Sequence, residues 1–198
     1  MSKELSKAER TRQYIIETTS VVFNKKGYAG TSLSDLTEAT GLTKGSIYGN
    51  FENKEEVALA VFDYNCCRTT DMISKRMAGA HTFYDKLMVY TRVYSSQSLS
   101  ERGGCAILNT AVEADDTNDL LKEKAAKAVL KWKKNITELI EGGIAAGEFK
   151  ADINVEQTAI SMVALIEGGI MIGKVTNSQA NLSQVLKTVE SVINQMKR

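Results

Sequence analysis

Apolar residues recur at helical spacing along nearly the whole chain. In the first segment, Ile15, Ile16, Val22 and Phe23 fall at i, i+1, i+7 and i+8, which places them on one face of a helix. No segment shows the strict alternation of apolar and polar residues that is typical of a half-buried strand. The pattern therefore predicts an all-α fold.

Polar caps and glycines mark where the predicted helices begin and end. The first helix is expected to end at Gly27, and a capping box of Ser32 and Asp35 begins a second helix that Gly41 ends. The other expected segments are a short helix over 43–49, a long helix capped by Asn53 and Glu56, a helix over 87–94, a loop over 95–104, a helix over 118–144, and two helices capped by Asn154 with Gln157 and by Asn181 with Gln184.

The composition fits a globular helical protein. The 198 residues include no proline, 43% are hydrophobic and 25% are charged, which excludes disordered and collagen-like chains. There is no run of about 18 apolar residues and no apolar leader, so neither a membrane span nor a signal peptide is expected. Three cysteines (Cys66, Cys67 and Cys105) suggest reduced thiols in a cytoplasm. The single histidine, His81, makes a metal site unexpected, and no cofactor is expected.

The charge balance limits how the protein can bind nucleic acid. The formal net charge is +1, and residues 1–60 carry eight basic and eight acidic side chains. Binding by bulk electrostatics is therefore unsupported. If the chain binds DNA, a few placed residues must do so, and the affinity should depend only weakly on salt.

Residues 31–51, TSLSDLTEATGLTKGSIYGNF, have the pattern of a helix, a tight turn and a second helix. Leu36 and Ile47 would share a core, and Gly41 suits the turn because a positive φ is easy there. The outer face of the second helix is polar, with side chains of the length that reaches base edges and phosphates. A plain structural corner is the alternative interpretation of this stretch alone.

A more specific pattern extends over residues 12–54. Its parts are an aromatic-then-Gly-Tyr helix end over 23–28, a Thr-Ser cap at 31–32, the run GLTKGSIY over 41–48, and Phe51 followed by Asn-Lys-Glu over 53–55. This stretch resembles the DNA-binding domain of the TetR family of transcriptional regulators. Weaker matches to one common C-terminal type lie over 103–114, 143–149 and 167–169. Thr37, Thr40 and Asn50 depart from the family pattern, so the operator sequence cannot be transferred.

The resemblance implies an all-α protein of about nine helices, with a three-helix DNA-binding domain over 1–52 and a helical effector-binding and dimerisation domain over 53–198. It also implies a recognition helix in the major groove of operator DNA. The residues that match the family's DNA-binding positions are Thr31, Ser32, Thr43, Lys44, Gly45, Ser46, Tyr48, Asn50 and Lys54. Lys3, Lys7, Arg10 and Arg12 would form a basic arm or, alternatively, a frayed and solvated terminus.

The last two predicted helices have two interpretations. Apolar residues at 3/4 spacing and glycines inside a helix would either close the core of one chain or form half of a symmetric four-helix dimer interface. The resemblance favours a homodimer. The expected interface residues are Gly169, Gly173, Val185, Val189 and Ile193.

The effector is the least determined part of the sequence. Candidate pocket residues, which would otherwise be ordinary core, are Tyr90, Tyr94, Cys105, Trp132, Met162 and Met171. Some relatives with a similar Gly-Cys segment sense electrophiles, which makes Cys105 with Lys174 a candidate thiol sensor; a small buried residue is the alternative for Cys105.

These observations predict a cytoplasmic homodimeric repressor that a small molecule or a reactive electrophile releases from a palindromic operator. An activator, and a ligand-binding or adaptor dimer without repressor activity, are the alternatives. An enzyme is not expected, because no nucleophile–base pair, phosphate loop or metal cluster is found in the sequence.

Overall fold

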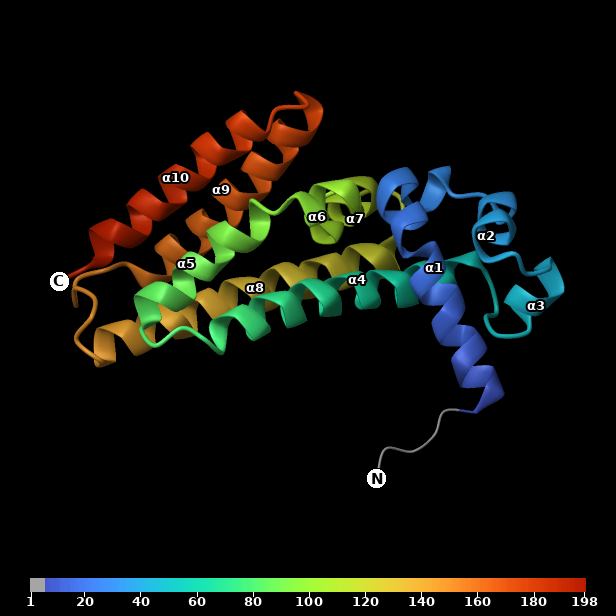
Figure 1. The fold of residues 1–198 in the computed structure, drawn as a ribbon, viewed down its shortest axis with the longest axis horizontal. Helices are drawn as coiled ribbons and strands as arrows, with labels where there is room; N and C mark the ends of the chain where they lie inside the picture. The colour runs from blue at the N-terminus through green and yellow to red at the C-terminus, as the bar shows by residue number, and fades with distance from the viewer. Residues whose placement is uncertain (1–5) are drawn as a thin grey trace. The chain divides into compact units, whose positions relative to one another are not determined.

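In the part of the chain that the structure describes, the helices are joined by short turns and loops, and no strand is present. This computed structural model describes residues 6–198, with the backbone alone at residues 97 and 98. One isolated bridge joins Phe149 to Lys197. The helices, shown in Figure 1, are α1 (Lys7–Gly30), α2 (Leu33–Thr40), α3 (Lys44–Tyr48), α4 (Lys54–Met77), α5 (Phe83–Tyr94), α6 (Gln97–Glu101), α7 (Ala106–Ala114), α8 (Asp119–Ala145), α9 (Val155–Val175) and α10 (Gln179–Met196).

Side-chain caps set most of the helix starts, as the sequence predicts. Ser32 and Asp35 form the capping box of α2, the Asn53 side chain accepts from the Glu56 amide at 2.9 Å, and the Asn154 side chain accepts from the Gln157 amide at 3.1 Å. The predicted end of the first helix at Gly27 is confirmed by its backbone. Gly27 lies inside the range of α1 but has a φ of 74°, outside the helical region, so the regular helix stops there. Each of these caps bonds a backbone amide within three residues, which is why local sequence specifies them.

Three predicted boundaries are wrong. The helix expected over 87–94 begins at Phe83, with Thr82 as its N-cap. The last helix begins earlier than expected, because Ser178 is its N-cap and accepts from the Asn181 amide. The segment 95–104 is not simply a loop, since it contains α6 before Gly103 and Gly104 turn the chain with φ values of 98° and 86°. Polar residues that suit a loop also suit a one-turn helix, so the sequence pattern does not separate the two.

The chain divides into two compact units. One comprises residues 1–68 and 106–125, and the other comprises 69–105 and 126–198. This division differs from the expected boundary at 52/53, because the first part of α4, all of α7 and the start of α8 belong to the first unit. Sequence order alone does not reveal that α7 packs with the N-terminal helices.

The first unit is built around α1. This helix packs against α2 and α7, and α2 packs against α3. The shared hydrophobic core is formed by Ile15, Phe23, Leu36, Ile47, Phe51, Val57, Ala58 and Val61. Figure 1 shows α2 and α3 as two short helices that follow α1. The core therefore holds the helix pair that the sequence identifies as helix-turn-helix.

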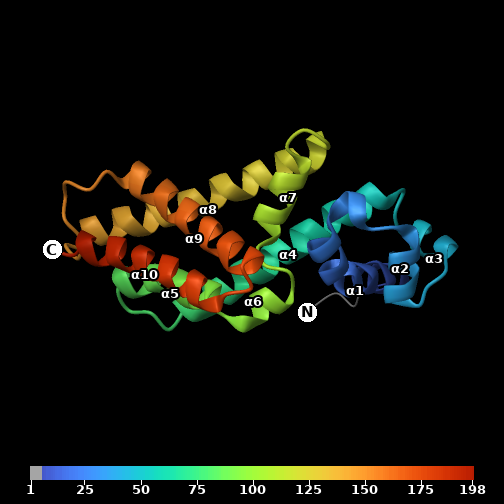
Figure 2. The ribbon, with the colours of Figure 1, turned by 90° about the horizontal axis from the view of Figure 1, so that it is seen from above.

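In the second unit, α9 and α10 lie side by side, as both Figure 1 and Figure 2 show. Two glycines of α9 make this close packing possible. A Cβ on Gly169 would lie 3.1 Å from Cβ of Val185, and one on Gly173 would lie 2.9 Å from Cβ of Leu182. The cost of glycine within a helix is offset here by close helix–helix contact.

α9 is also the one helix among the described residues that is long and apolar enough to cross a membrane, with a mean hydropathy of 1.5. The helix still contains no uninterrupted run of about 18 apolar residues, because Glu156, Gln157 and Glu167 lie within it. α9 resembles a membrane-spanning helix only in length and composition, and the core helix of a globular protein has the same properties. α9 packs against α10 and α5 and buries Ala159, Met162, Val163, Ile166, Gly169 and Ile170.

Candidate DNA-binding site

The turn between α2 and α3 is fixed by local hydrogen bonds. Gly41 adopts φ 67° and its amide donates to the Thr37 carbonyl. The Thr40 hydroxyl donates to the Leu36 carbonyl at 2.7 Å and accepts from the Leu42 amide at 3.2 Å. Thr40 is buried, so its hydroxyl needs these partners. This departure from the family pattern is thus accommodated inside the motif.

The helix-turn-helix is also bonded to α1. The Tyr14 hydroxyl donates to the Thr40 carbonyl at 2.9 Å, at the end of α2. On α3, the Thr43 side chain caps the helix by accepting from the Ser46 amide at 3.2 Å. A five-residue helix is too short to be stable alone. These bonds and the buried Ile47 hold it in place.

The structure brings most of the predicted DNA-contact residues onto this motif with at least part of the side chain accessible. The exposed ones are Ser32, Thr43, Lys44 and Gly45, and the half-buried ones are Ser46, Tyr48, Asn50 and Lys54. Lys44 stands in the first turn of α3 with an exposed ammonium group, which suits a phosphate or a guanine edge.

Thr31 is placed differently from the other eight. Its side chain is fully buried, and its hydroxyl donates to the Gly27 carbonyl at 2.6 Å. The expectation that Thr31 shares the capping of the next helix is wrong, because Ser32 alone is the N-cap. Thr31 closes the turn after α1 instead.

Lys54 is held at the start of α4 by the backbone of the first unit. Its Nζ donates to the carbonyls of Tyr28 at 2.8 Å and Thr31 at 2.9 Å. The ammonium also lies 4.3 Å from the centre of the Tyr28 ring. The pKa of Tyr28 is raised mainly by burial, and the negative charge of Glu55 raises it by a smaller amount. Through these two hydrogen bonds, Lys54 stabilises the segment 28–31, and it is also a predicted DNA contact.

Arg12 belongs to the fold and not to a flexible arm. Its Nη2 lies 2.7 Å from Glu56 Oε1, its Nη1 donates to the Asn50 carbonyl, and its guanidinium stacks 3.9 Å from the centre of the Phe51 ring. Lys7 and Arg10 are exposed in the first turns of α1. Lys3 lies outside the described residues. The frayed terminus is thus wrong for residues 7–12, which are helical.

Two acidic side chains of the first unit are held in their charged form. The hydrogen bond from Lys26, at 2.6 Å, and those from Ser32 lower the pKa of Asp35 to about 2. The Glu52 amide and then Arg12 lower the pKa of Glu56. Each carboxylate thus forms an ion pair with a basic side chain of the same unit, Asp35 with Lys26 and Glu56 with Arg12.

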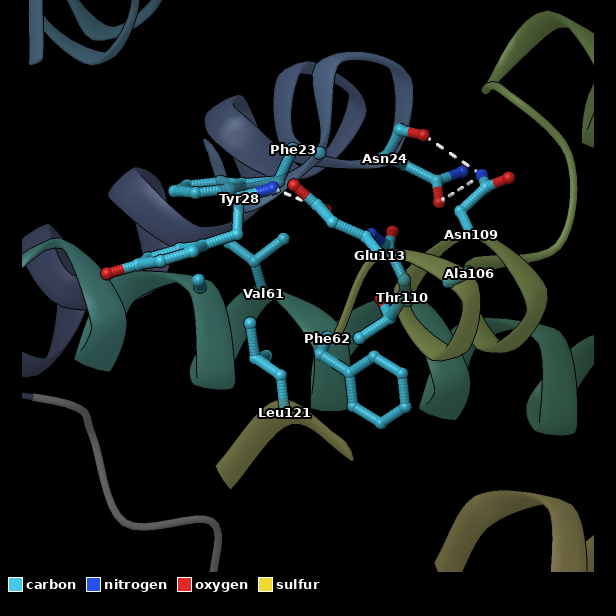
Figure 3. A pocket seen from close by; sticks show the side chains of 13 residues that line it. Phe23, Asn24, Tyr28, Val61, Phe62, Ala106, Asn109, Thr110, Glu113 and Leu121 are labelled. Atoms are coloured by element: carbon cyan, nitrogen blue, oxygen red, sulfur yellow. Dashed lines mark hydrogen bonds between the residues drawn. The ribbon is translucent and has the colours of Figure 1, made fainter. Parts of the chain in front are cut away.

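A contact between α7 and the end of α1 was not predicted from the sequence. Figure 3 shows Glu113 pointing toward Tyr28 and Asn109 toward Asn24. A small cavity of about 30 Å³ lies beside them, room for roughly one water molecule. It is too small for an effector. The bonded residues lie 85 positions apart, and the only local signal of the contact is a glycine at a helix end.

The predicted pocket residues are mostly filled core of the second unit. Tyr90, Tyr94 and Trp132 stack, with Trp132 at 6.3 Å and 5.0 Å between ring centres, and all three are buried. Met162 is fully buried, while Met171 is 46% exposed on α9. The structure thus brings the aromatic residues together and places Met171 apart from them.

A larger cavity of about 240 Å³ opens in the second unit. Of the predicted pocket and sensor residues, Tyr94 and Lys174 line it. Its other lining residues are Leu99, Ser100, Gly104, Ile170, Gly173, Asn177, Ser178, Gln179 and Leu182.

Cys105 is buried beside this cavity's glycines. Its Sγ donates to Glu167 Oε1 at 3.0 Å. Burial raises the pKa of Glu167 to about 7, and the bond from Cys105 opposes this shift. Lys174 Nζ donates to the Gly103 carbonyl at 2.9 Å. Among the described residues, no cluster of three His, Cys, Asp or Glu side chains could hold a metal ion.

The predicted dimer-interface residues pack within one chain. Val189 and Ile193 are fully buried, and Gly169 and Gly173 face Val185 and Leu182 of α10. Val185 is half-buried. A different set of apolar side chains on α9 is exposed, namely Ile160, Met171, Ile172 and Val175.

A capped helix pair that shares a core with a supporting helix and presents a polar short helix defines a helix-turn-helix DNA-binding protein. Residues 15–61 match the family described as bacterial regulatory proteins, tetR family, and residues 85–189 match the tetracyclin repressor-like, C-terminal domain. The chain belongs to the TetR family of transcriptional regulators.

Individual relatives agree with this assignment. The HTH-type transcriptional regulator TtgR of Pseudomonas putida is 29% identical over 81% of this chain and 79% of its own length. The HTH-type transcriptional repressor DhaR of Mycobacterium sp. is 26% identical, with 90% and 89% covered. The crystal structure of a TetR-family regulator from Cytophaga hutchinsonii is 51% identical, covers 98% of both chains and superposes with a TM-score of 0.95.

Proposed function

We propose that this transcriptional regulator is a cytoplasmic homodimeric repressor that binds a palindromic operator through α3 and leaves it when a small molecule binds. The observation that carries the proposal is a helix-turn-helix, held in place by hydrogen bonds and buried side chains, that exposes Thr43 and Lys44 at the start of α3. The relative DhaR is named a repressor. No role as an enzyme is proposed.

Within this proposal, the accessible residues of the motif contact different parts of the DNA. Lys44 meets a phosphate or a guanine edge, and Ser32, Thr43 and Ser46 offer hydroxyls to the backbone or to bases. The Asn50 amide donates one hydrogen bond to the Ser46 carbonyl at 2.9 Å, which leaves its oxygen and its second N–H available to DNA. Thr31 acts only through the fold.

The test is a titration of the DNA upstream of the protein's own gene. Lys44→Ala should weaken binding about tenfold, because one charge-assisted contact per half-site is lost. The matched control is Lys131→Ala on the exposed side of α8 in the second unit, which should bind as the wild type does. A plot of log affinity against log salt should be shallow, with a slope of about −0.9 per neutralised phosphate.

Two results would contradict this proposal. The adaptor alternative would be favoured if the wild-type protein shifted neither this DNA nor any other fragment in a genomic selection. Equal affinities of Lys44→Ala and Lys131→Ala would remove α3 from the contact.

The outer face of α9 supports a dimer. Ile160, Ala164, Gly168, Met171 and Val175 recur at helical spacing along it and are accessible or have open space around them. A Cβ added to Gly168 would meet nothing within 4 Å, so no contact inside the chain accounts for a helix-interior glycine there. A second chain laid against this stripe would account for it.

The cavity of about 240 Å³ supports a non-covalent effector of modest size. Its lining combines apolar side chains such as Leu99, Ile170 and Leu182 with Lys174 and several uncharged polar residues. The alternative is an electrophile that reacts with Cys105. Burial and a bonded carboxyl group oppose the thiolate that such a reaction needs. The two are separated by Cys105→Ser, which abolishes release from DNA by N-ethylmaleimide only if the thiol is the sensor.

A further inference from the structure

The end of α1 is a helix terminus with a side-chain partner from far along the chain. Gly27 adopts φ 74° and ψ 178°, which breaks the helix and turns the next two amides outward. Both amides donate to the carboxylate of Glu113 on α7. Tyr28 N lies 2.8 Å from Oε2 and Ala29 N lies 2.8 Å from Oε1 (Figure 3). One carboxylate thus holds two consecutive peptide groups.

The approach of Glu113 depends on the absence of a side chain at residue 27. A Cβ there would lie 2.7 Å from the carboxylate carbon of Glu113, closer than Cβ atoms approach other atoms in proteins. The positive φ of Gly27 is a second, independent reason for glycine. A second bond joins the same helices, since Asn109 Nδ2 donates to the Asn24 carbonyl at 3.0 Å and to its Oδ1 at 3.1 Å.

The segment that Glu113 holds leads directly into the DNA-binding motif. Its carbonyls at Tyr28 and Thr31 accept hydrogen bonds from Lys54. The next residue, Ser32, caps α2. The peptide groups of 28–31 are therefore held through their amides by a carboxylate and through their carbonyls by an ammonium group. Few conformations satisfy both sets of bonds, so the entry of the chain into α2 is fixed.

We propose that Glu113 is a positioning residue for operator binding. By bonding the amides of Tyr28 and Ala29, it fixes the connection from α1 to α2 and, through the shared core, the presentation of α3. Glu113 lies within the region 85–189 that matches the C-terminal domain, while Gly27 lies within the region 15–61 that matches the DNA-binding domain. A residue of the regulatory domain's sequence is thus part of the DNA-binding unit. The inference rests on the proposed operator binding.

The test compares three variants. Glu113→Ala removes both bonds, and Glu113→Gln keeps one acceptor oxygen. Asp116→Ala is the control, because it removes the same charge from an exposed position just after α7. Amide hydrogen exchange by NMR reports the bonds directly, and titration of the upstream DNA reports their effect. Circular dichroism and light scattering verify that each variant is folded and has the wild-type mass.

The proposal predicts that Glu113→Ala loses the exchange protection of Tyr28 and Ala29 and binds the operator about tenfold more weakly. Glu113→Gln should fall between it and the wild type, and it keeps the test informative if the alanine variant does not fold. Asp116→Ala should keep the protection and bind within about twofold of the wild type. Losing a negative charge favours DNA binding in general, so weaker binding by Glu113→Ala cannot come from charge.

Two outcomes would overturn the proposal. The first is lost protection in both Glu113 variants with unchanged operator affinity, which would make the contact merely structural. The second is the same protection in Glu113→Ala as in the wild type, which would mean that the carboxylate does not hold the amides. Wild-type protein that binds no DNA would instead refute the proposed function, while the exchange measurement would still decide whether the bonds form.

Discussion

Two neighbouring hydroxyl-bearing residues have different roles at the entrance to α2. Ser32 is exposed and caps the helix, whereas Thr31 beside it is buried and bonds the Gly27 carbonyl. Both carry a hydroxyl, so the sequence does not distinguish them. The difference lies in the direction of the two side chains: the Thr31 hydroxyl bonds back to the Gly27 carbonyl, while the Ser32 hydroxyl accepts from the Asp35 amide.

Glu167 is a carboxyl group whose ionisation the fold strongly affects. Burial raises the pKa of Glu167 to about 7 from an ordinary value of 4.5. Between these pH values the folded protein keeps a proton that the unfolded chain releases. The free energy of unfolding therefore falls as the pH rises through this window, and the loss is complete above pH 7.

Glu167→Gln should remove this pH dependence, because glutamine does not ionise. Relative to the wild type, the variant should gain stability between pH 5 and pH 8, by roughly 2–3 kcal/mol. The measurement is chemical denaturation at both pH values, with Glu138→Gln on the exposed side of α8 as the control. A wild-type-minus-variant difference that stays constant with pH would contradict the assignment.

At the level of the elements, helix starts and helix packing differ in how far the sequence specifies them. The caps at Ser32, Asn53 and Asn154 were predicted correctly, since a cap bonds amides of its own first turn. For the glycines in α9, the sequence pattern with the family resemblance predicts a place at a dimer interface. The structure places α10 of the same chain against Gly169 and Gly173.

The two kinds of glycine in α9 should respond differently to alanine. Gly173→Ala places a Cβ 2.9 Å from Cβ of Leu182, so α9 and α10 must separate, at a cost of about 1–3 kcal/mol in the free energy of unfolding. Within a single chain, the Cβ of Gly168→Ala meets nothing within 4 Å and the substitution improves helix propensity, so at protein concentrations where the chain is monomeric its stability should be unchanged or rise by up to about 1 kcal/mol. Urea denaturation checks both. Equal losses in the two variants would mean that α10 does not pack as the structure has it.

For the whole molecule, the sequence order of the parts differs from their grouping in space. The first unit takes α7 and the start of α8 from the middle of the chain, while α4 and α8 each contribute to both units. The proposed dimer adds a contact between two chains, and the exposed apolar face of α9 is the candidate surface for it. Its tests therefore need substitutions that leave the packing of a single chain intact.

Met171→Glu meets this requirement, because Met171 is 46% exposed. If the outer face of α9 forms the dimer interface, the buried charge should convert the protein to a monomer and abolish operator binding at concentrations where the wild type binds. Leu130→Glu on α8 is the matched control, at 62% exposure. Light scattering that finds Met171→Glu still dimeric at micromolar concentration would exclude this face.

The sequence by itself determined the helical fold class, the helix-turn-helix over 31–51, most helix starts and the family. These features depend on periodicity, on caps and on turns, which act within a few residues. Only the tertiary structure decided that Thr31 is buried, that α10 covers Gly169 and Gly173, and that Glu113 bonds the amides after Gly27. Those contacts join residues up to 85 positions apart. Packing of the assembled core selects them, and no local pattern in the chain encodes that choice.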